Sequence, residues 1–173
     1  MPLTAPSGDE NLNRWYDTPK RHSVDSDSDL GLQTSNFKAG AIFDMLDFIA
    51  RDSYARYLGI EITDYGPGTA KAKLVLQQHH LNSMGSVHGG AVFSLADAVF
   101  SVASNSHGGI AMAVNVSISF FKAVREGALV AEAREISLNR KLATYLIDVT
   151  DDHGNAVAMF QGTVYKKQDV SER

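Results

Sequence analysis

The chain contains no cysteine among its 173 residues, and this absence excludes three kinds of chemistry. Disulfide bonds, thiolate metal sites and cysteine nucleophiles all need a side chain that the sequence does not contain. With 44% hydrophobic and 21% charged residues, the chain has the composition of a soluble globular protein. Its length is sufficient for one well-buried core, so we expect one main domain in a cytoplasmic setting.

The sequence also lacks an excess of positive charge and a long apolar run. A formal net charge of -4 and a pI near 5.8 argue against nucleic acid as the main partner. The most apolar stretch is interrupted by Asp97 and several serines, so it is shorter than the ~20 residues that cross a bilayer. The first ten residues lack the basic-then-apolar order of a secretory signal. We therefore expect no membrane segment and no secretion.

The first part of the chain lacks apolar periodicity. Residues 1–35 are rich in Ser, Asp and Asn, which predicts a flexible tail. We expect the folded domain at residues 36–167 and a short C-terminal tail at residues 168–173.

Within this domain the apolar pattern changes its period several times. Residues 37–55 predict an amphipathic helix, and a long apolar helix after residue 88 is expected to end near residues 105–109. Strands are predicted at residues 58–64 and 69–76, as a hairpin, and at 110–121, 128–137, 142–150 and 156–166, as a four-stranded meander. The apolar residues at alternate positions from Ile110 to Phe120 are expected on one face of their strand. This pattern predicts an α+β fold with an antiparallel sheet wrapped around the long helix.

The stretch from Asn82 to Asp97 carries the polar groups that are hardest to explain structurally. Glycines surround His88 in a predicted turn, and the helix that follows is apolar on all sides, which indicates burial. Asp97 lies inside this helix. A buried carboxylate costs free energy unless it is paired or used, so Asp97 is the first candidate for a functional residue.

The glycines before the helix favour an anion or carbonyl ligand. Backbone N–H groups at a helix start have no partners within the helix and attract negative charge, so they suit a phosphate or the oxyanion of an acyl-transfer step. The phosphate alternative lacks support, because no Lys or Arg lies between Asn82 and Asn105 and no nucleotide-binding glycine pattern is present. A serine hydrolase is also disfavoured, since Gly-x-Ser-x-Gly does not occur.

The spacing of Gly89 and Asp97 predicts a site shared by two chains. Eight helical residues separate them by about 12 Å, whereas general-base or nucleophilic attack needs a reach of roughly 3 Å. If both act on one substrate, each must come from a different subunit. Helical spacing also predicts a polar stripe that lines the interface cleft, made of Ser94, Asp97, Ser101 and Ser104.

Several candidates have a structural alternative. Asp97 could be a carboxylate satisfied by serine or backbone groups. His88 could orient the turn, which we favour, or transfer a proton. Asn82 could hold a water or carbonyl, or serve local turn chemistry. Arg140 and Lys141 are expected in a solvated turn, with phosphate contact as the alternative. A metal site at His79, His80 and His88 is disfavoured, because neighbouring loop histidines point apart and lack a carboxylate at ligand spacing.

The motif Asn82-x-x-Gly85-x-x-His88-Gly89-Gly90, followed by Phe93-Ser-Leu-Ala-Asp97 and Ser104-Asn105, resembles hotdog-fold acyl-CoA thioesterases of the phenylacetate-pathway (PaaI-like) type. More loosely, the resemblance covers residues 58–167. It implies a curved sheet around the long helix, subunits paired as dimers and commonly as a homotetramer, and hydrolysis of an acyl-CoA to a carboxylic acid and coenzyme A. The expected acyl group is aryl, phenylacetyl or medium-chain, with no metal and no cofactor besides the coenzyme A of the substrate.

The resemblance also implies roles for individual residues. Asp97 matches the catalytic carboxylate, either base or nucleophile, and Gly89 matches the oxyanion donor. His88 and Asn82 match supporting positions, and Gly90, Ser101, Ser104, Arg140 and Lys141 complete the candidate substrate contacts. Where relatives often have Arg-Pro, this chain has Lys122-Ala123. A non-hydrolysing acyl-CoA-binding module and a hydratase on the same scaffold are the rival functions.

Overall fold

The computed structural model describes residues 39–167, and side chains from Met45 onward. The expected tails at residues 1–35 and 168–173 lie outside the described residues. Two helices precede the sheet, α1 (Ala39–Arg51) and α2 (Ser53–Tyr57), and a third, α3 (Gly89–Asn105), follows its first hairpin. The strands are β1 (Ile60–Gly66), β2 (Thr69–Val75), β3 (Ile110–Phe120), β4 (Ala128–Leu138), β5 (Leu142–Asp151) and β6 (Ala156–Lys167), and a short 3₁₀ helix, η2, spans Gln78–His80.

The prediction of one continuous amphipathic helix over residues 37–55 is wrong, because two helices, α1 and α2, occupy this region. The break falls at Asp52, whose carboxylate accepts the backbone N–H of Ala55 at 2.9 Å. An Asp side chain that satisfies a free N–H in this way starts a helix rather than continuing one. Asp52 therefore ends the run of α1 and caps α2.

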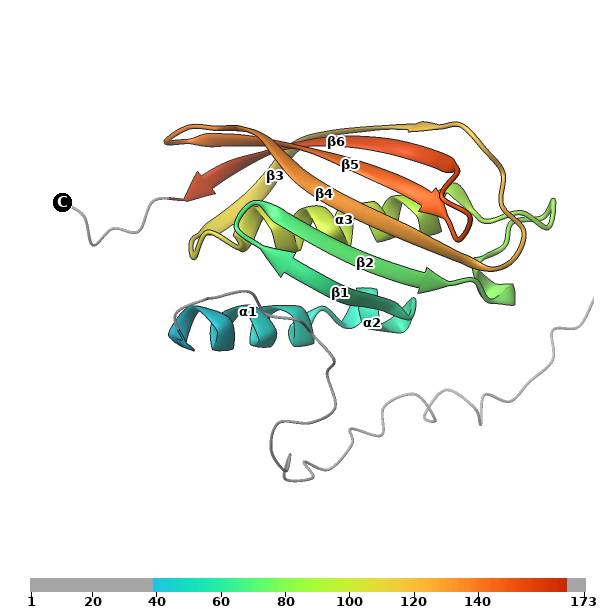
Figure 1. Ribbon diagram of the computed structural model, residues 1–173, viewed down its shortest axis with the longest axis horizontal. Helices are drawn as coiled ribbons and strands as arrows, with labels where there is room; N and C mark the ends of the chain where they lie inside the picture. Colours follow the sequence, from blue (N-terminus) through green and yellow to red (C-terminus); the bar gives the residue numbers. More distant parts are fainter. Residues whose placement is uncertain (1–38, 168–173) are drawn as a thin grey trace, which may run out of the picture. The chain divides into compact units, whose positions relative to one another are not determined.

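All six strands form one antiparallel sheet with the order β1-β2-β4-β5-β6-β3 (Figure 1). The expected meander is wrong in one neighbour, because β3 pairs with β6 and not with β4. After β3, the N–H groups of Phe121 and Lys122 bond to the carbonyl of Val157, which holds the connection beside β6. Beside β5, the second neighbour of β4 is therefore β2 and not β3, with Thr69 opposite Arg134.

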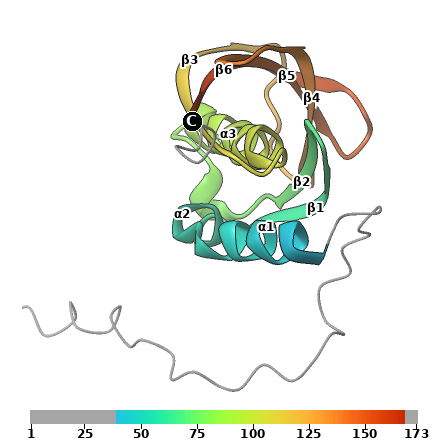
Figure 2. The ribbon, with the colours of Figure 1, turned by 90° about the vertical axis from the view of Figure 1, so that its left-hand side faces the viewer.

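The sheet curls around α3, while α1 and α2 lie below that helix (Figure 2). Its concave face and α3 form the core, in which Leu95, Val99 and Phe100 are almost fully buried. Phe100 needs a glycine opposite it: a Cβ added to Gly162 in β6 would lie 2.6 Å from the ring. This close fit fixes the rotation of α3 against the sheet and so determines which residues of α3 face outward.

The apolar residues of β3 do not share one face, contrary to the sequence-based expectation. A bulge between Ala113 and Asn115 shifts the register, so that Met112 pairs with Tyr165 but Ile118 pairs with Phe160. An extra residue in a strand reverses the alternation after it. Ile118 thus faces the core, whereas three apolar side chains earlier in the strand remain about three-fifths exposed, namely Ile110 at 58%, Met112 at 61% and Val114 at 59%.

Candidate active site

The start of α3 is built by His88, which is its N-cap residue. Its imidazole Nδ1 accepts the backbone N–H of Gly90 at 2.8 Å, and its carbonyl accepts the N–H of Ala91 at 2.9 Å. An N-cap side chain that binds an N–H of the first turn stabilises the helix start. With Nδ1 occupied as an acceptor, His88 orients the glycine turn, and the N–H of Gly90 is already used.

Gly89, the first residue of α3, presents a backbone N–H for which residues 39–167 provide no acceptor. A Cβ added at this position would lie 3.3 Å from the ring of Phe120, which ends β3. The glycine therefore leaves the N–H accessible beside an aromatic side chain. Such a free donor at a positive helix end is suited to a carbonyl oxygen that gains negative charge.

The loop before His88 is held by Asn82. Its side-chain oxygen accepts the N–H groups of Met84 at 2.9 Å and Ser86 at 3.2 Å, and its own N–H donates to the carbonyl of Ser86 at 2.8 Å. Gly85 takes a positive φ of 69° in this turn. The structure thus shows Asn82 holding the loop that leads to His88. Its part in the reaction stays a prediction.

His80 supports the same loop, and the sequence-based interpretation missed this role. Its Nδ1 accepts the N–H of Gln77 at 3.0 Å, its Nε2 bonds to the carbonyl of Leu58 at 2.9 Å, and its backbone carbonyl accepts the N–H of His88 at 2.8 Å. Burial, followed by the neighbouring His79, lowers the pKa of His80, which keeps the ring neutral. The signal in the sequence was the histidine pair His79-His80, which one residue separates from Asn82.

Metal binding finds no support at these histidines. Both ring nitrogens of His80 are engaged with the backbone, so neither is free for a ligand bond. Across residues 39–167 no group of three His, Asp or Glu side chains is placed to hold a metal ion.

Asp97 lies two turns beyond Gly89 on α3 and is partly buried. Within the described part of the chain its carboxylate has no hydrogen bond and no ion pair. Burial, and secondarily the negative charge of Asp52, raises the pKa of Asp97 above its ordinary value. A carboxylate that is desolvated and unpaired is a stronger base than one in water, which is the property that proton abstraction needs.

The serines expected to form an open polar stripe differ in their exposure. Ser94 donates its hydroxyl to the carbonyl of Gly90 at 2.8 Å and lies 3.5 Å from the hydroxyl of Tyr54. Ser101 is partly buried, and its carbonyl accepts the hydroxyl of Ser104 at 3.2 Å. Ser104 is only 4% exposed. Near Asp97 the stripe is therefore accessible, whereas its C-terminal end is bound into the helix.

Arg140 and Lys141 lie in the exposed turn between β4 and β5, at the other end of the sheet from Gly89. The carbonyl of Lys141 accepts the N–H of Lys166, close to the pairing of Ile110 with Lys167. Phe120, at the opposite end of β3, is the residue that touches Gly89. Ten residues of extended strand span roughly 33 Å, so a single chain does not bring these basic residues to its own Gly89.

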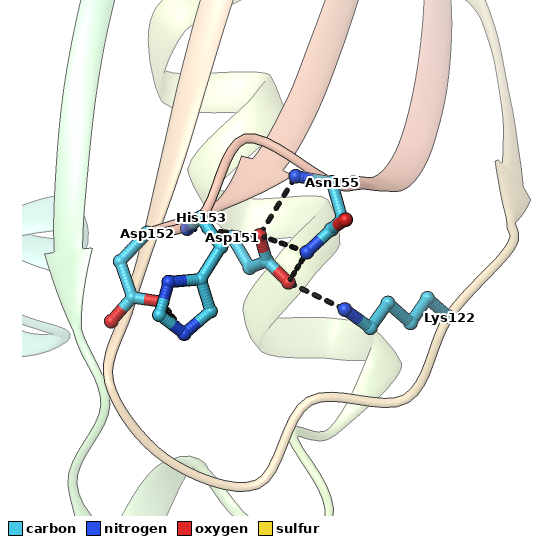
Figure 3. A network of polar contacts seen from close by, with 5 residues as sticks. All are labelled: Lys122, Asp151, Asp152, His153 and Asn155. Atoms are coloured by element: carbon cyan, nitrogen blue, oxygen red, sulfur yellow. Dashed lines mark hydrogen bonds and ion pairs between the residues drawn. The ribbon is translucent and has the colours of Figure 1, made fainter.

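A polar cluster just beyond the end of β3 that carries Phe120 was not predicted from the sequence (Figure 3). Asp151 accepts Lys122 Nζ at 2.7 Å and is also bonded by the backbone and side-chain amide of Asn155 and the N–H of His153. These bonds, led by that of Lys122, hold the pKa of Asp151 well below its ordinary value. Lys122 is thus occupied by a buried carboxylate.

Comparisons with known proteins identify the family of this chain. The family model of the thioesterase superfamily matches residues 84–158, which include Gly89 and Asp97. A relative from Archaeoglobus fulgidus is 45% identical over 116 residues, which are 66% of this chain and 75% of that protein. The acyl-coenzyme A thioesterase PaaI of Escherichia coli is 33% identical over 116 residues, covering 66% of this chain and 83% of its own length.

A solved structure gives the same result for the fold. The E. coli PaaI protein from the phenylacetic acid degradation operon superposes with a TM-score of 0.71 at 29% identity, over 74% of this chain and 94% of that chain. The chain therefore belongs to the thioesterase superfamily, in its PaaI-like group. The hotdog fold and the class of thioester hydrolase, both expected from the sequence motif, are confirmed.

Proposed function

We propose that this protein is an acyl-CoA thioesterase whose active site is formed by two chains. The observation that carries the proposal is the placement on one helix of two groups that have no bonded partner in the described part of the chain, the N–H of Gly89 and the carboxylate of Asp97. Their separation of about 12 Å along the axis is too long for one thioester carbonyl. Gly89 of one subunit and Asp97 of the partner subunit therefore act together.

The proposed reaction uses these two groups and water, with coenzyme A as part of the substrate and no other cofactor. The thioester carbonyl oxygen accepts the N–H of Gly89, which stabilises the developing oxyanion. Asp97 takes a proton from water, whose oxygen attacks the carbonyl carbon. As the tetrahedral intermediate collapses, the C–S bond breaks, and the coenzyme A thiolate leaves and takes up a proton. In the alternative route Asp97 attacks directly and water hydrolyses the resulting anhydride. Incorporation of labelled water oxygen into Asp97 separates the two routes.

The edge strand β3 supports pairing of two chains. In the described structure it pairs with β6 alone, and it carries exposed apolar side chains at Ile110, Met112 and Val114. An unpaired strand edge with apolar residues is suited to another chain. Antiparallel pairing of two β3 edges brings the start of one strand near the end of the other. It thereby brings Arg140 and Lys141 of the partner subunit toward Gly89, where they would contact coenzyme A phosphates.

The substrate we propose is an aryl- or phenylacetyl-CoA, or a medium-chain acyl-CoA, used in a cytoplasmic setting. The named activity of the E. coli relative supports coenzyme A as the thiol. Among the described residues no helix is long and apolar enough to cross a membrane. Further assembly of two dimers into a tetramer is part of the proposal and is tested by size measurements in solution.

Replacing Gly89 by proline tests the oxyanion donor directly. Proline has no N–H and is well accepted at the first residue of a helix, and His88 already has the extended backbone (ψ 134°) that must precede it. We expect kcat to fall about 10²–10³-fold. Gly89→Ala is the matched control, because it introduces a Cβ toward Phe120 but retains the N–H. Equal rates for the two variants would contradict the donor role.

Mixing Gly89→Pro with Asp97→Asn tests the shared site. A mixed dimer has one site with both lesions and one site with neither. Random reassembly of equal amounts should therefore restore about a quarter of the wild-type rate of thiol release. No recovery after subunit exchange, verified by size and by differently tagged chains, would place the two groups in separate sites.

A non-hydrolysing acyl-CoA-binding module is the rival function. A panel of aryl-, phenylacetyl- and fatty acyl-CoA esters distinguishes it, because the rival binds these ligands but releases no thiol. The free carboxylate of Asp97 favours hydrolysis, since a binding module gains nothing from an unpaired, desolvated charge.

A further inference from the structure

The ring of Phe120 lies beside the oxyanion donor and is exposed there. It is the side chain that a Cβ at Gly89 would meet first, at 3.3 Å, so it occupies the space next to the N–H. Phe120 pairs with Ala158, and the pairing of Ile118 with Phe160 shows that this end of β3 faces the core side of the sheet. Although it faces the core side, Phe120 remains 53% exposed. More than half of the Phe120 side chain is therefore accessible to solvent, and its ring lies close to Gly89.

The position of Phe120 is fixed by the backbone around it. The N–H of the following residue, Phe121, bonds to the carbonyl of Val157 at 2.8 Å, and Lys122 is held by Asp151. The loop after them is joined to the glycine turn, because the N–H of Val87 bonds to the carbonyl of Val124 at 2.7 Å. These bonds hold the backbone of Phe120 in place relative to the glycine turn, which a specificity contact requires.

We propose that Phe120 is a specificity-determining residue that stacks against the acyl group of the substrate while Gly89 binds the carbonyl oxygen. This inference rests on the proposed thioesterase function and deepens it, since it assigns an aromatic acyl group. An aromatic pair gains roughly two- to tenfold in affinity beyond the burial of area, so a planar ring on the substrate gains more from Phe120 than a flexible chain does. The shared site then consists of Gly89 and Phe120 of one subunit facing Asp97 of the partner subunit.

The test compares kcat/KM for phenylacetyl-CoA and hexanoyl-CoA in wild type, Phe120→Leu and Phe120→Ala. We expect the preference for phenylacetyl-CoA to fall about tenfold in Phe120→Leu, which keeps an apolar side chain but removes the ring. Phe120→Ala should lower both rates and remove the preference. Phe121→Ala is the matched control, because Phe121 is a neighbouring phenylalanine of similar exposure, 57%, and should leave the preference unchanged.

Three results would overturn the inference. Equal losses for both esters in Phe120→Leu would show that the ring only supports the loop. Conversion of this variant to monomers in size measurements would assign Phe120 to subunit contact. An equal loss of the phenylacetyl-CoA preference in Phe121→Ala would show that the effect is not specific to Phe120.

If the wild type releases thiol from no ester, the proposed function fails. The Phe120 contact is then tested by calorimetric binding of both esters to proteins that also carry Asp97→Asn. Tighter binding of phenylacetyl-CoA that depends on Phe120 supports the contact, and equal binding of the two esters contradicts it.

Discussion

Asp97 and Asp151 are both largely removed from water, yet their surroundings are opposite. Asp151, in the turn between β5 and β6, is bonded by Lys122, Asn155 and His153, and its pKa is lowered. Asp97, in the middle of α3, has no bonded partner among the described residues, and its pKa is raised. One carboxylate stabilises a turn, whereas the other, which we propose as the base, is desolvated without compensating bonds from the described residues. Burial alone therefore does not distinguish the two carboxylates, whereas their hydrogen bonds do.

The largest expected difference between the two carboxylates is in catalysis. Asp97→Asn removes the base and should lower kcat for thiol release by about 10²–10⁴-fold, with circular dichroism and oligomeric size unchanged. Asp151→Asn, assayed at a temperature where it is folded, should keep a rate within a few-fold of wild type. If Asp97→Asn retained the wild-type rate, the contrast between the two aspartates would have no functional meaning.

The next largest effect is on stability, where Asp151→Asn should change Tm more than Asp97→Asn does. Asp151→Asn loses the ion pair with Lys122 and the charge-assisted bonds of the turn, so its Tm should be lower by several degrees. Because the folded pKa is depressed, this stabilisation is present above the ordinary Asp pKa of about 3.9 and is lost as pH falls toward the folded pKa. Thermal melts at pH 7 and pH 3 should therefore show a smaller difference between wild type and variant at pH 3. A constant difference would contradict the charged role of Asp151.

Asp97→Asn should have a smaller effect of opposite sign. Since the folded pKa of Asp97 is raised, its charged form disfavours the folded state at pH values above that pKa. The uncharged amide removes this penalty, so Tm at pH 7 should rise slightly. The gain should disappear as pH falls through the raised pKa to the ordinary one. A lower Tm at neutral pH would indicate an unrecognised stabilising partner of Asp97.

The smallest effect is expected from Asp52, whose charge is the secondary cause of the raised Asp97 pKa. Asp52→Asn retains a side-chain oxygen for the N–H of Ala55 but removes the negative charge. The acid limb of the kcat/KM profile should then move to lower pH, with the plateau rate nearly unchanged. Asp47→Asn, which also removes a negative charge but from the pair with Arg51 on α1, is the matched control. Equal displacement of both profiles would indicate a general charge effect.

Local patterns in the sequence allowed much of this structure to be predicted. The limits of α3, the hairpin between β1 and β2, and the turns at residues 139–141 and 152–155 follow from glycines, asparagines and alternation of neighbouring residues. The pairing of β3 with β6 and the bulge at Val114 were not predictable in this way. Both depend on contacts between distant parts of the chain, and the apolar alternation of β3 continues unbroken through the bulge.

The candidate site shows the same division. The sequence by itself determined that a glycine N–H and a carboxylate lie eight residues apart on one helix. Their separation of about 12 Å follows, because the rise per residue of a helix is independent of the rest of the fold. Only the tertiary structure decided that Asp97 has no bonded partner within residues 39–167 while Asp151 has several, and that the ring of Phe120 lies close to Gly89. Desolvation and hydrogen bonding depend on which distant segments pack against a side chain, and no local pattern contains that information.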